Sequence, residues 1–246
     1  MTIVRAGFFS LTSAVEGGTE EDYLRWHLLD HLPEQHSLPG VRLGTRWRAD
    51  DACVAARILA TPAFDPVRHA VCYLMTEPVE QTLHDFGALA GRLRAEGRMP
   101  MRAVQHLLGA LSVEAAHSNL VSTDALPFRP HHGVVLVVES GTGDLDAAAH
   151  PLLAVPGVAG VLAFRATDAL GAGPDQGERF GLPPWNPAGH AVTIVYVDDD
   201  LEATTAALRP VVEARWRSGG LEPHLAAPFR TSTVPAVGLE PTLSTT

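Results

Sequence analysis

The sequence has no lysine and only two cysteines. All 18 basic residues are arginines, which we attribute to the codon usage of a GC-rich genome. Cys53 and Cys72 lack metal-ligand spacing, and a single pair makes no framework of several disulfides. We therefore expect reduced thiols and a cytoplasmic location.

Signals for membranes, nucleic acids and nucleotides are also missing. No apolar run approaches the ~18 residues of a membrane-spanning helix, and residues 1–10 lack the apolar core of a signal peptide. With 28 acidic against 18 basic residues the net charge is −10, which disfavours nucleic acid and anionic membranes as partners. No dinucleotide-binding glycine motif, phosphate loop or nucleophile elbow occurs, so nucleotide use and serine-hydrolase chemistry have no support.

What the sequence does have is a histidine-bearing helix within residues 23–40, which end in Pro-Gly. At 100° per residue, three leucines form one stripe: Leu24, Leu28 and Leu32. His31 lies inside this stripe and His27 flanks it. An imidazole that faces apolar surface needs a polar partner, so this helix is the centre of any functional hypothesis.

The first half of the chain has the order β-α-β-β-α-β. Alternating β-formers predict strands at residues 2–10, 41–48, 69–76 and 102–113. Helical periodicity predicts helices from an N-cap at Thr19 to about Glu34 and from 79 to about 96, with a loop at 49–68. This order is that of the ferredoxin-like split βαβ unit.

The second half repeats the order. Strands are predicted at 132–140, 158–165, 190–197 and 224–234, and helices at 144–157 and 200–218. Residues 170–189, rich in Gly and Pro, form either a long β–β connection or a lid. We expect a first repeat at 1–114, a linker at 115–131, a second repeat at 132–235 and a tail at 236–246.

Matching letters support a tandem duplication. Pro-Gly-Val recurs with Gly40 and Gly157, a difference of 157 − 40 = 117. His-Ala-Val recurs with His69 and His190, a difference of 190 − 69 = 121. Two blocks in the same order predict two repeats of one fold.

The helix motif and the strand order resemble the EthD-like branch of the dimeric α+β barrel proteins. The matching letters are Tyr23, Trp26, His31-Leu32-Pro33, Leu38-Pro39-Gly40 and the strand at 68–74. The resemblance implies an α+β fold in which two tandem ferredoxin-like repeats form a pseudo-dimeric barrel, with a pocket between sheet and helices in each half. It also implies relatives of several activities: cofactor-free monooxygenases, polyketide cyclases, dehydratases, muconolactone-type isomerases and haem peroxidases.

His31 and His27 are the candidate catalytic residues. A neutral imidazole at pH 7 takes a proton from carbon or oxygen and returns it elsewhere. By the offset of 117, Ala148 is the counterpart of His31 and Asp144 that of His27, so only the first half carries imidazoles at these helix positions. His150 falls two positions beyond the counterpart of His31, and we expect it to face outward.

Four further residues are candidates for the wall of the first pocket: Tyr23, Trp47, Tyr73 and His106. Arg46 and Arg48 have the side-chain chemistry to clamp a carboxylate or an enolate. Strand alternation puts both arginines on the face away from Trp47, so we expect them in solvent or at an interface.

We expect no metal and no other cofactor. His27 and His31 have the i, i+4 spacing of zinc ligands, but the sequence contains no HExxH, and no proximal-histidine context for haem is recognisable.

Two classes of function follow. The first is a cofactor-independent enzyme with His31 as general acid/base on a small, apolar carbonyl or aromatic, polyketide-like compound, acting as cyclase, dehydratase, isomerase or decarboxylase; a cofactor-free monooxygenase is a further alternative. The second is a non-catalytic binding or structural barrel in which His31 only packs. A cavity of roughly 300 Å³ or more beside His31 favours the enzyme. The expected partner is a small-molecule substrate, and a homodimer through the remaining surface stays open.

Overall fold

A computed structural model describes residues 2–100, 102–167 and 189–232 of the chain. The first half contains these elements: β1 (Ala6–Glu16), α1 (Glu20–Trp26), the π-helical turn η1 (His27–His31), α2 (Leu32–His36), β2 (Val41–Arg48), α3 (Asp51–Ala55), β3 (Leu59–Ala60), β4 (His69–Met75), α4 (Val79–Ala95) and β5 (Arg102–Ser118). After the short 3-10 helix η2 (Leu126–Phe128), the second half contains β6 (Gly133–Gly141), α5 (Leu145–Leu153), β7 (Val158–Arg165), β8 (His190–Val197), α7 (Leu201–Arg217) and β9 (Leu221–Thr231).

All strands of the described residues belong to one sheet that closes on itself. The order is β2-β4-β1-β5-β7-β8-β6-β9-β3, and β2 also pairs with β9. The order β5-β1-β4-β2 in the first half and β9-β6-β8-β7 in the second is that of a ferredoxin-like unit, so the predicted fold class is confirmed. The seam between β5 and β7 is long, whereas the seam between β2 and β9 comprises only two residue pairs, Trp47↔Thr231 and Arg48↔Arg230.

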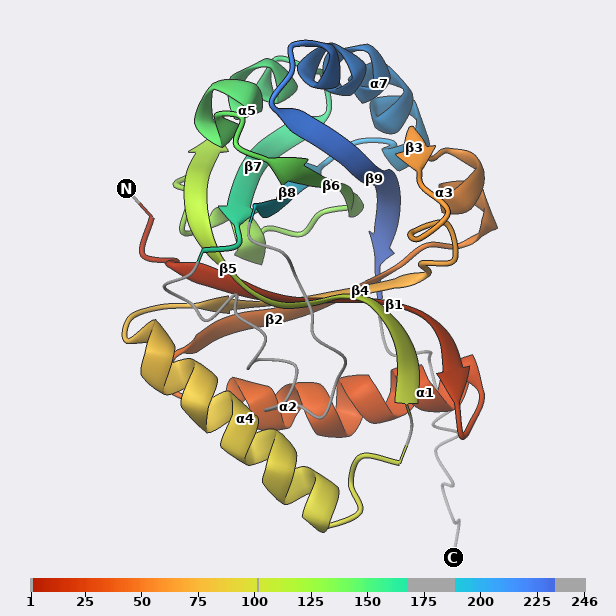
Figure 1. The fold of residues 1–246 in the computed structure, drawn as a ribbon, viewed down its shortest axis with the longest axis vertical. Coiled ribbons are helices and arrows are strands. Elements are labelled where there is room, and N and C mark those ends of the chain that lie inside the picture. Colours follow the sequence, from red (N-terminus) through yellow and green to blue (C-terminus); the bar gives the residue numbers. More distant parts are fainter. Residues whose placement is uncertain (1, 101, 168–188, 233–246) are drawn as a thin grey trace, which may run out of the picture.

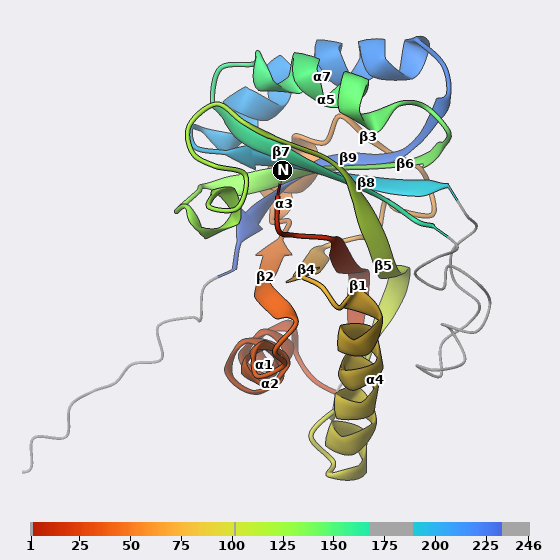
Figure 2. The same cartoon turned by 90° about the vertical axis from the view of Figure 1, so that its left-hand side faces the viewer.

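Helices cover the outside of this barrel. Helices α5 and α7 lie over the second half of the sheet, and α1, α2 and α4 lie over the first half on the opposite side of the molecule (Figures 1 and 2). Large apolar side chains such as Phe9, Trp47, Phe164 and Phe229 fill the interior of the barrel. The layer between the first-half sheet and its helices has a separate, smaller core around Phe8, Val71, Tyr73 and Phe86. Any ligand cavity of the first half is therefore outside the barrel, in the layer between the first-half sheet and its helices.

The first helical segment starts as the sequence predicts and ends differently. Thr19 caps it in a capping box with Asp22, since each side chain bonds the backbone N–H of the other residue. The segment continues beyond the predicted end at Glu34 to His36. Its middle is π-helical: the N–H of Leu32 bonds the carbonyl of His27, five residues back. Pro33 follows at once and lacks an N–H, which favours a widened turn here.

Two sequence expectations differ from the described structure, and others lie outside the described residues. The predicted loop at 49–68 contains α3 and the short strand β3, which extends the barrel edge beside β9. The first-repeat boundary expected at residue 114 falls within β5, whose residues up to Ser118 pair with β7. The predicted loop or lid at 170–189 lies, except for Gly189, outside the described residues, as do the end of the predicted last strand and the tail at 236–246.

The His-Ala-Val match is displaced by one residue in the structure. Arg48 pairs with His69 in one half, and Arg165 pairs with Ala191 in the other. Because 165 − 48 = 117, Ala191 is the counterpart of His69, and the offset is 191 − 69 = 122 rather than 121. A one-residue displacement turns a side chain to the other face of a strand, so His190 does not occupy the position of His69.

No helix among the described residues is long and apolar enough to cross a membrane.

Candidate functional site

A cavity of about 510 Å³ lies between the first-half sheet and the helices that cover it. Apolar side chains from β1, β4, α4 and β5 form most of its wall, among them Phe8, Val71, Phe86 and Leu108. The histidine helix contributes Tyr23, Trp26, His27, His31 and Gln35. Further polar side chains come from the sheet and α4: Ser10, Tyr73, Arg94 and Gln105. The volume exceeds the roughly 300 Å³ that favours an enzyme, and the wall combines apolar surface with polar groups, as ligand sites do.

His31 stands at this wall with one ring nitrogen unoccupied. Its ring stacks on Trp26, with ring centroids 4.9 Å apart, and its Nε2 lies 3.4 Å from Nε2 of Gln35. Nδ1 of His31 is buried and has no hydrogen-bond partner among the described residues. Burial lowers the pKa of His31 from 6.5 to about 4, partly offset by the nearby charge of Asp30. The imidazole is therefore neutral at pH 7 and able to accept a proton.

His27 lies deeper and contacts a tyrosine. Its Nε2 is 3.3 Å from the hydroxyl of Tyr73 on β4, and its Nδ1 has no partner within the described part of the chain. Burial, followed by the charge of Arg46, lowers the pKa of His27 well below its ordinary value. Burial likewise raises the pKa of Tyr73. Both groups are therefore uncharged at neutral pH, a phenol beside an imidazole.

Arg46 corrects the expectation of a solvent-facing side chain. It does lie on the strand face away from Trp47, but that face is covered by α1, and Arg46 is only 1% exposed. Its guanidinium carbon sits 4.4 Å from the ring centroid of Tyr23, in a cation–π contact. None of its three side-chain nitrogens has a hydrogen-bond partner among the residues described. Arg48, in contrast, is half-exposed and pairs with Glu20 at 2.5 Å.

The buried charge of Arg46 acts on every imidazole around it. It contributes to lowering the pKa of His27, of His31 and of His69, whose pKa falls to about 3 chiefly through burial. A positive field that disfavours an imidazolium also disfavours a metal cation and favours an anion at the same place. The donor set of this cavity therefore suits a developing negative charge better than a metal ion.

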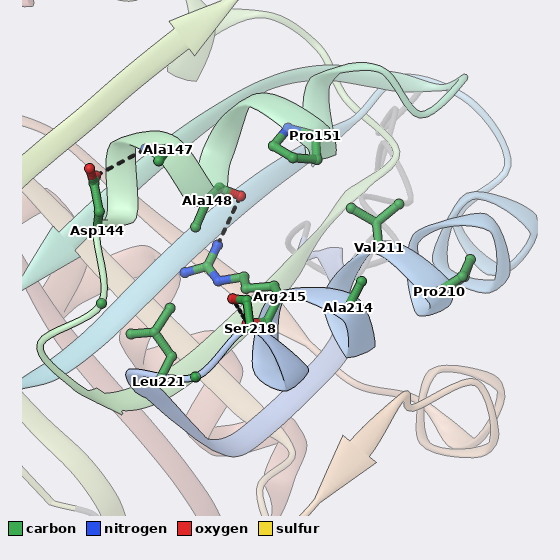
Figure 3. A pocket seen from close by; sticks show the side chains of 12 residues that line it. Asp144, Ala147, Ala148, Pro151, Pro210, Val211, Ala214, Arg215, Ser218 and Leu221 are labelled. Carbon is green, nitrogen blue, oxygen red and sulfur yellow. Dashed lines mark hydrogen bonds between the residues drawn. The ribbon is translucent and has the colours of Figure 1, made fainter.

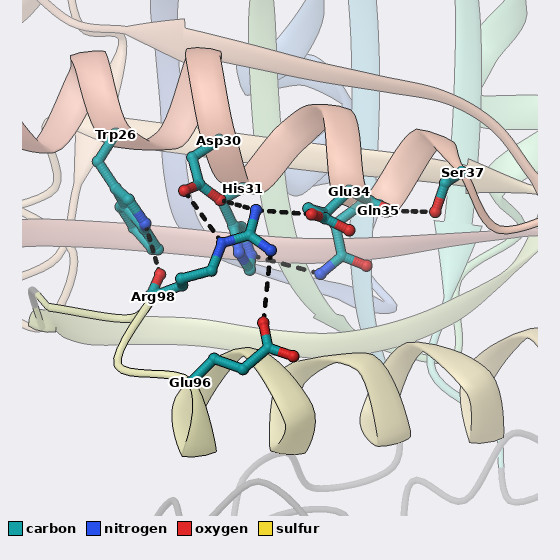
Figure 4. A network of polar contacts seen from close by, with 8 residues as sticks. All are labelled: Trp26, Asp30, His31, Glu34, Gln35, Ser37, Glu96 and Arg98. Carbon is teal, nitrogen blue, oxygen red and sulfur yellow. Dashed lines mark hydrogen bonds and ion pairs between the residues drawn. The ribbon is translucent and has the colours of Figure 1, made fainter.

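A polar network on the outer side of the helix was not foreseen from the sequence. Arg98, just beyond α4, pairs with Asp30 and Glu34 at 2.7 and 2.6 Å, and its backbone carbonyl accepts a bond from Nε1 of Trp26 (Figure 4). These contacts fix the ring of Trp26 against which His31 stacks. They join positions 68 and 72 residues apart, so no local pattern indicates them.

The other predicted wall residues divide evenly. Tyr23 and Tyr73 line the cavity. Trp47 does not: it is 1% exposed and packs inside the barrel, because it lies on the face of β2 opposite to Arg46. His106 is also elsewhere, with its Nδ1 2.6 Å from the carbonyl of Ala63 and its Nε2 2.8 Å from the hydroxyl of Ser13.

In the second half, a cavity of about 600 Å³ lies between α5 and α7. Ala148 lines it, as the offset of 117 from His31 requires, and no histidine is among its described lining residues. Its polar feature is Arg215, which extends between the two helices (Figure 3) and forms a buried ion pair with Glu139. Nε1 of Trp216 also donates to Glu139. The charge here is internally neutralised, and the two halves differ in chemistry.

Comparisons with known proteins identify the fold. No family model matches the sequence, and no curated protein matches it either. Among the solved structures that match, the following two cover nearly the whole chain. "Putative Chlorite dismutase TA0507" has a TM-score of 0.55 and 15% identity, covering 95% of this chain and 96% of that chain. "Putative monooxygenase (FN1347)" from Fusobacterium nucleatum subsp. nucleatum has a TM-score of 0.54 and 8% identity, covering 95% and 94%. At such identities the likeness shows the fold, that of the dimeric α+β barrel proteins, and does not distinguish the EthD-like branch.

Proposed function

We propose that the chain is an enzyme that moves protons on a small, largely apolar carbonyl or phenolic compound held in the first-half cavity. The observation that carries the proposal is the buried, unpartnered Nδ1 of His31 at the wall of a 510 Å³ cavity. A buried polar atom without a partner costs free energy unless a ligand satisfies it. His27 presents a second such nitrogen nearby, with ring centroids of the two histidines 5.4 Å apart.

The chemistry begins with proton abstraction. With the amide of Gln35 turned so that its unpartnered oxygen accepts from Nε2 of His31, Nδ1 of the neutral imidazole is free to act as the base. It takes a proton from a carbon next to a carbonyl group or from a phenol, and the electron pair of the broken bond moves onto the substrate oxygen. The field of Arg46 stabilises that oxyanion, since the same field disfavours the imidazolium forms of His27 and His31. Arg46 acts from below the wall as a positioning charge, and it does not touch the substrate.

The product depends on where the proton returns. Delivery from the imidazolium of His31 to a different carbon gives isomerisation. Delivery to a hydroxyl group that leaves as water gives dehydration, and attack of the enolate carbon on a second carbonyl of the same molecule gives cyclisation. The phenol of Tyr73, hydrogen-bonded to His27, is the second group placed to give or take a proton at this wall.

A cofactor-free monooxygenase is the second candidate. The observation that favours it is the likeness to the structure described as a monooxygenase, together with a cavity that suits an electron-rich anion. Oxygen chemistry without a cofactor starts from the same deprotonated substrate, so the first step is shared. Because only the monooxygenase reaction consumes oxygen, a measurement of oxygen uptake distinguishes the two reactions.

The test is exchange of substrate protons with solvent. Candidate β-dicarbonyl compounds and polyphenols are first ranked by thermal shift, and the binders are incubated with the protein in D₂O while loss of the acidic C–H signal is followed by NMR. We expect the unmodified chain to catalyse exchange of the substrate proton and His31→Asn not to catalyse it. The control variant His84→Asn, which changes an exposed histidine on α4, is expected to catalyse exchange at the normal rate. Compounds that bind without any exchange, oxygen uptake or turnover would instead identify a binding protein.

A further inference from the structure

A cluster of two histidines and an aspartate lies outside both cavities. His117 is on β5, and Asp146 and His150 are one turn apart on α5. Nε2 of His117 is 2.7 Å from Oδ1 of Asp146, and Nε2 of His150 is 3.9 Å from Oδ2 of the same carboxylate. The two imidazole rings are 4.4 Å apart between centroids.

We propose that these three residues form a binding site for a divalent transition metal, with Zn²⁺ as the best match. One ligand atom from each residue lies within 4.8 Å of the other two. Bonds of about 2.0–2.1 Å in a tetrahedron place neighbouring donor atoms about 3.3 Å apart. This value lies between the 2.7 Å from His117 to Asp146 and the 3.9 Å from His150 to Asp146. Small side-chain rotations therefore bring the donors to metal distance.

The chemistry of the donors selects the class of metal. Imidazole nitrogens suit zinc, copper and nickel, whereas Mg²⁺ and Ca²⁺ prefer sites made of oxygen ligands. Three protein ligands leave a fourth position for water, and the exposure of His150 and Asp146, at 60% and 56% of their side chains, gives that position access to solvent.

A second cluster shows what makes the first one distinctive. Asp50, Cys53 and Glu202 also lie within metal-binding distance of one another. There, however, Arg230 forms ion pairs with both carboxylates and supplies the compensating charge. Among the described residues, Asp146 has ion pairs only with the two histidines, so a cation meets no competing arginine at the His117 cluster.

The position of the cluster gives the metal a structural consequence. β5 belongs to the first repeat and α5 to the second, and β5 pairs with β7 at the long seam of the barrel. A metal held by both elements links the two halves beside that seam. Because the donors converge only in the folded chain, metal binding stabilises the folded state.

The experiment is a metal titration of the chelator-treated protein, read by calorimetry and by thermal melting. We expect Zn²⁺ to bind at one site per chain and to raise the melting temperature, and Mg²⁺ at the same concentration to leave it unchanged. His117→Ala and Asp146→Asn are expected to weaken Zn²⁺ binding at least ~10-fold each, consistent with loss of a ligand or of its charge.

The matched control is His84→Ala. His84 is also an exposed helical histidine, with Nδ1 3.3 Å from Asp85, but it belongs to no three-residue cluster among the described residues. Its removal is expected to leave zinc affinity unchanged. Equal affinity in His117→Ala and the unmodified chain, or binding lost equally in His84→Ala, would overturn the site. No readout involves the first-half cavity, so the result is independent of the proposed function.

Discussion

The hydroxyl of Tyr73 lies 3.3 Å from Nε2 of His27, and the contact joins strand β4 to the π-helical turn 46 residues earlier. Both residues are buried, and burial shifts both pKa values toward the uncharged forms. With the phenol as donor, the proton of His27 resides on Nδ1, the nitrogen without a protein partner among the described residues. Tyr73 in this way fixes which nitrogen of His27 offers a proton.

Replacement of the tyrosine tests this role. Tyr73→Phe removes the partner of His27 and leaves a buried nitrogen unsatisfied, so we expect a loss of about 1–3 kcal/mol in the free energy of unfolding. We also expect proton exchange on a bound substrate to slow by about 10²-fold or more, as for loss of a group that takes part in acid–base catalysis. Urea denaturation and exchange in D₂O measure the two effects. The control is Tyr196→Phe, which changes a buried tyrosine of the second half and is expected to leave the exchange rate unchanged. An equal exchange rate for Tyr73→Phe and the unmodified chain would rule out a catalytic role for the phenol of Tyr73.

Two buried arginines predict opposite responses to the same substitution. Arg46 has no ion-pair partner among the described residues, so Arg46→Met removes an uncompensated charge and is expected to leave the free energy of unfolding unchanged or higher. Arg215→Met strands Glu139 in the interior and is expected to cost about 3–5 kcal/mol. Chemical denaturation of both variants makes the comparison. A large destabilisation by Arg46→Met would show that the cation–π contact with Tyr23 outweighs the buried charge.

The same Arg46 variant predicts a change in titration. Because the charge of Arg46 contributes to the depressed pKa of His31, its removal is expected to move that pKa up from about 4 toward the ordinary 6.5. NMR titration of the imidazole signals measures the shift, and Arg48→Met, which replaces a half-exposed ion-paired residue, is the control. An unchanged pKa in Arg46→Met would mean that burial alone sets it.

Stability is expected to fall as the pH falls below 6.5. In the unfolded chain His31 and His69 protonate near 6.5, whereas in the folded chain their pKa values are about 4 and about 3. Between these values the unfolded state binds more protons, so the free energy of unfolding rises with pH across this window and is fully recovered above 6.5. Each histidine contributes at most about 1.4 kcal/mol per pH unit. Urea denaturation at pH 7, 6 and 5 measures the slope, which His31→Asn reduces; a flat profile contradicts the prediction.

Alanine substitutions at two glycines are expected to change the free energy of unfolding in opposite directions. A Cβ on Gly40, the glycine of the repeated Pro-Gly turn, would lie 1.7 Å from Oγ1 of Thr82 on α4, so Gly40→Ala forces the helix away and is expected to cost about 1–3 kcal/mol. Gly91 stands inside α4 with nothing within 4 Å of an added Cβ, so Gly91→Ala is expected to gain about 0.5–1 kcal/mol. Thermal melting of the two variants makes the comparison. Unchanged or higher stability of Gly40→Ala would contradict the close packing inferred there, and destabilisation by Gly91→Ala would contradict the open space inferred at Gly91.

The fold was predictable from the sequence because it is encoded locally. Helix caps, strand alternation and the recurring Pro-Gly-Val each act within a few residues, and together they gave the right architecture. The site was predictable only in part. Trp47 and Arg46 are both buried, Trp47 in the barrel interior and Arg46 against α1. Side-chain polarity therefore could not tell which of the two faces of β2 borders the cavity. The partner of Trp26, the backbone of Arg98, depends on tertiary contact alone.

Closure of the barrel within a single chain has a consequence for the freedom of its two halves to differ. In a symmetric homodimer every substitution occurs twice, and any change at one site is repeated at the other. Here the counterpart of His31 in the second repeat is Ala148. The buried arginine of the first half, Arg46, has no ion-pair partner among the described residues, whereas the buried arginine of the second half, Arg215, is neutralised by Glu139. Covalent linkage also keeps the halves at a high effective concentration, so either half can lose contacts without dissociation. One half is thereby free to change its chemistry while the other maintains the shape.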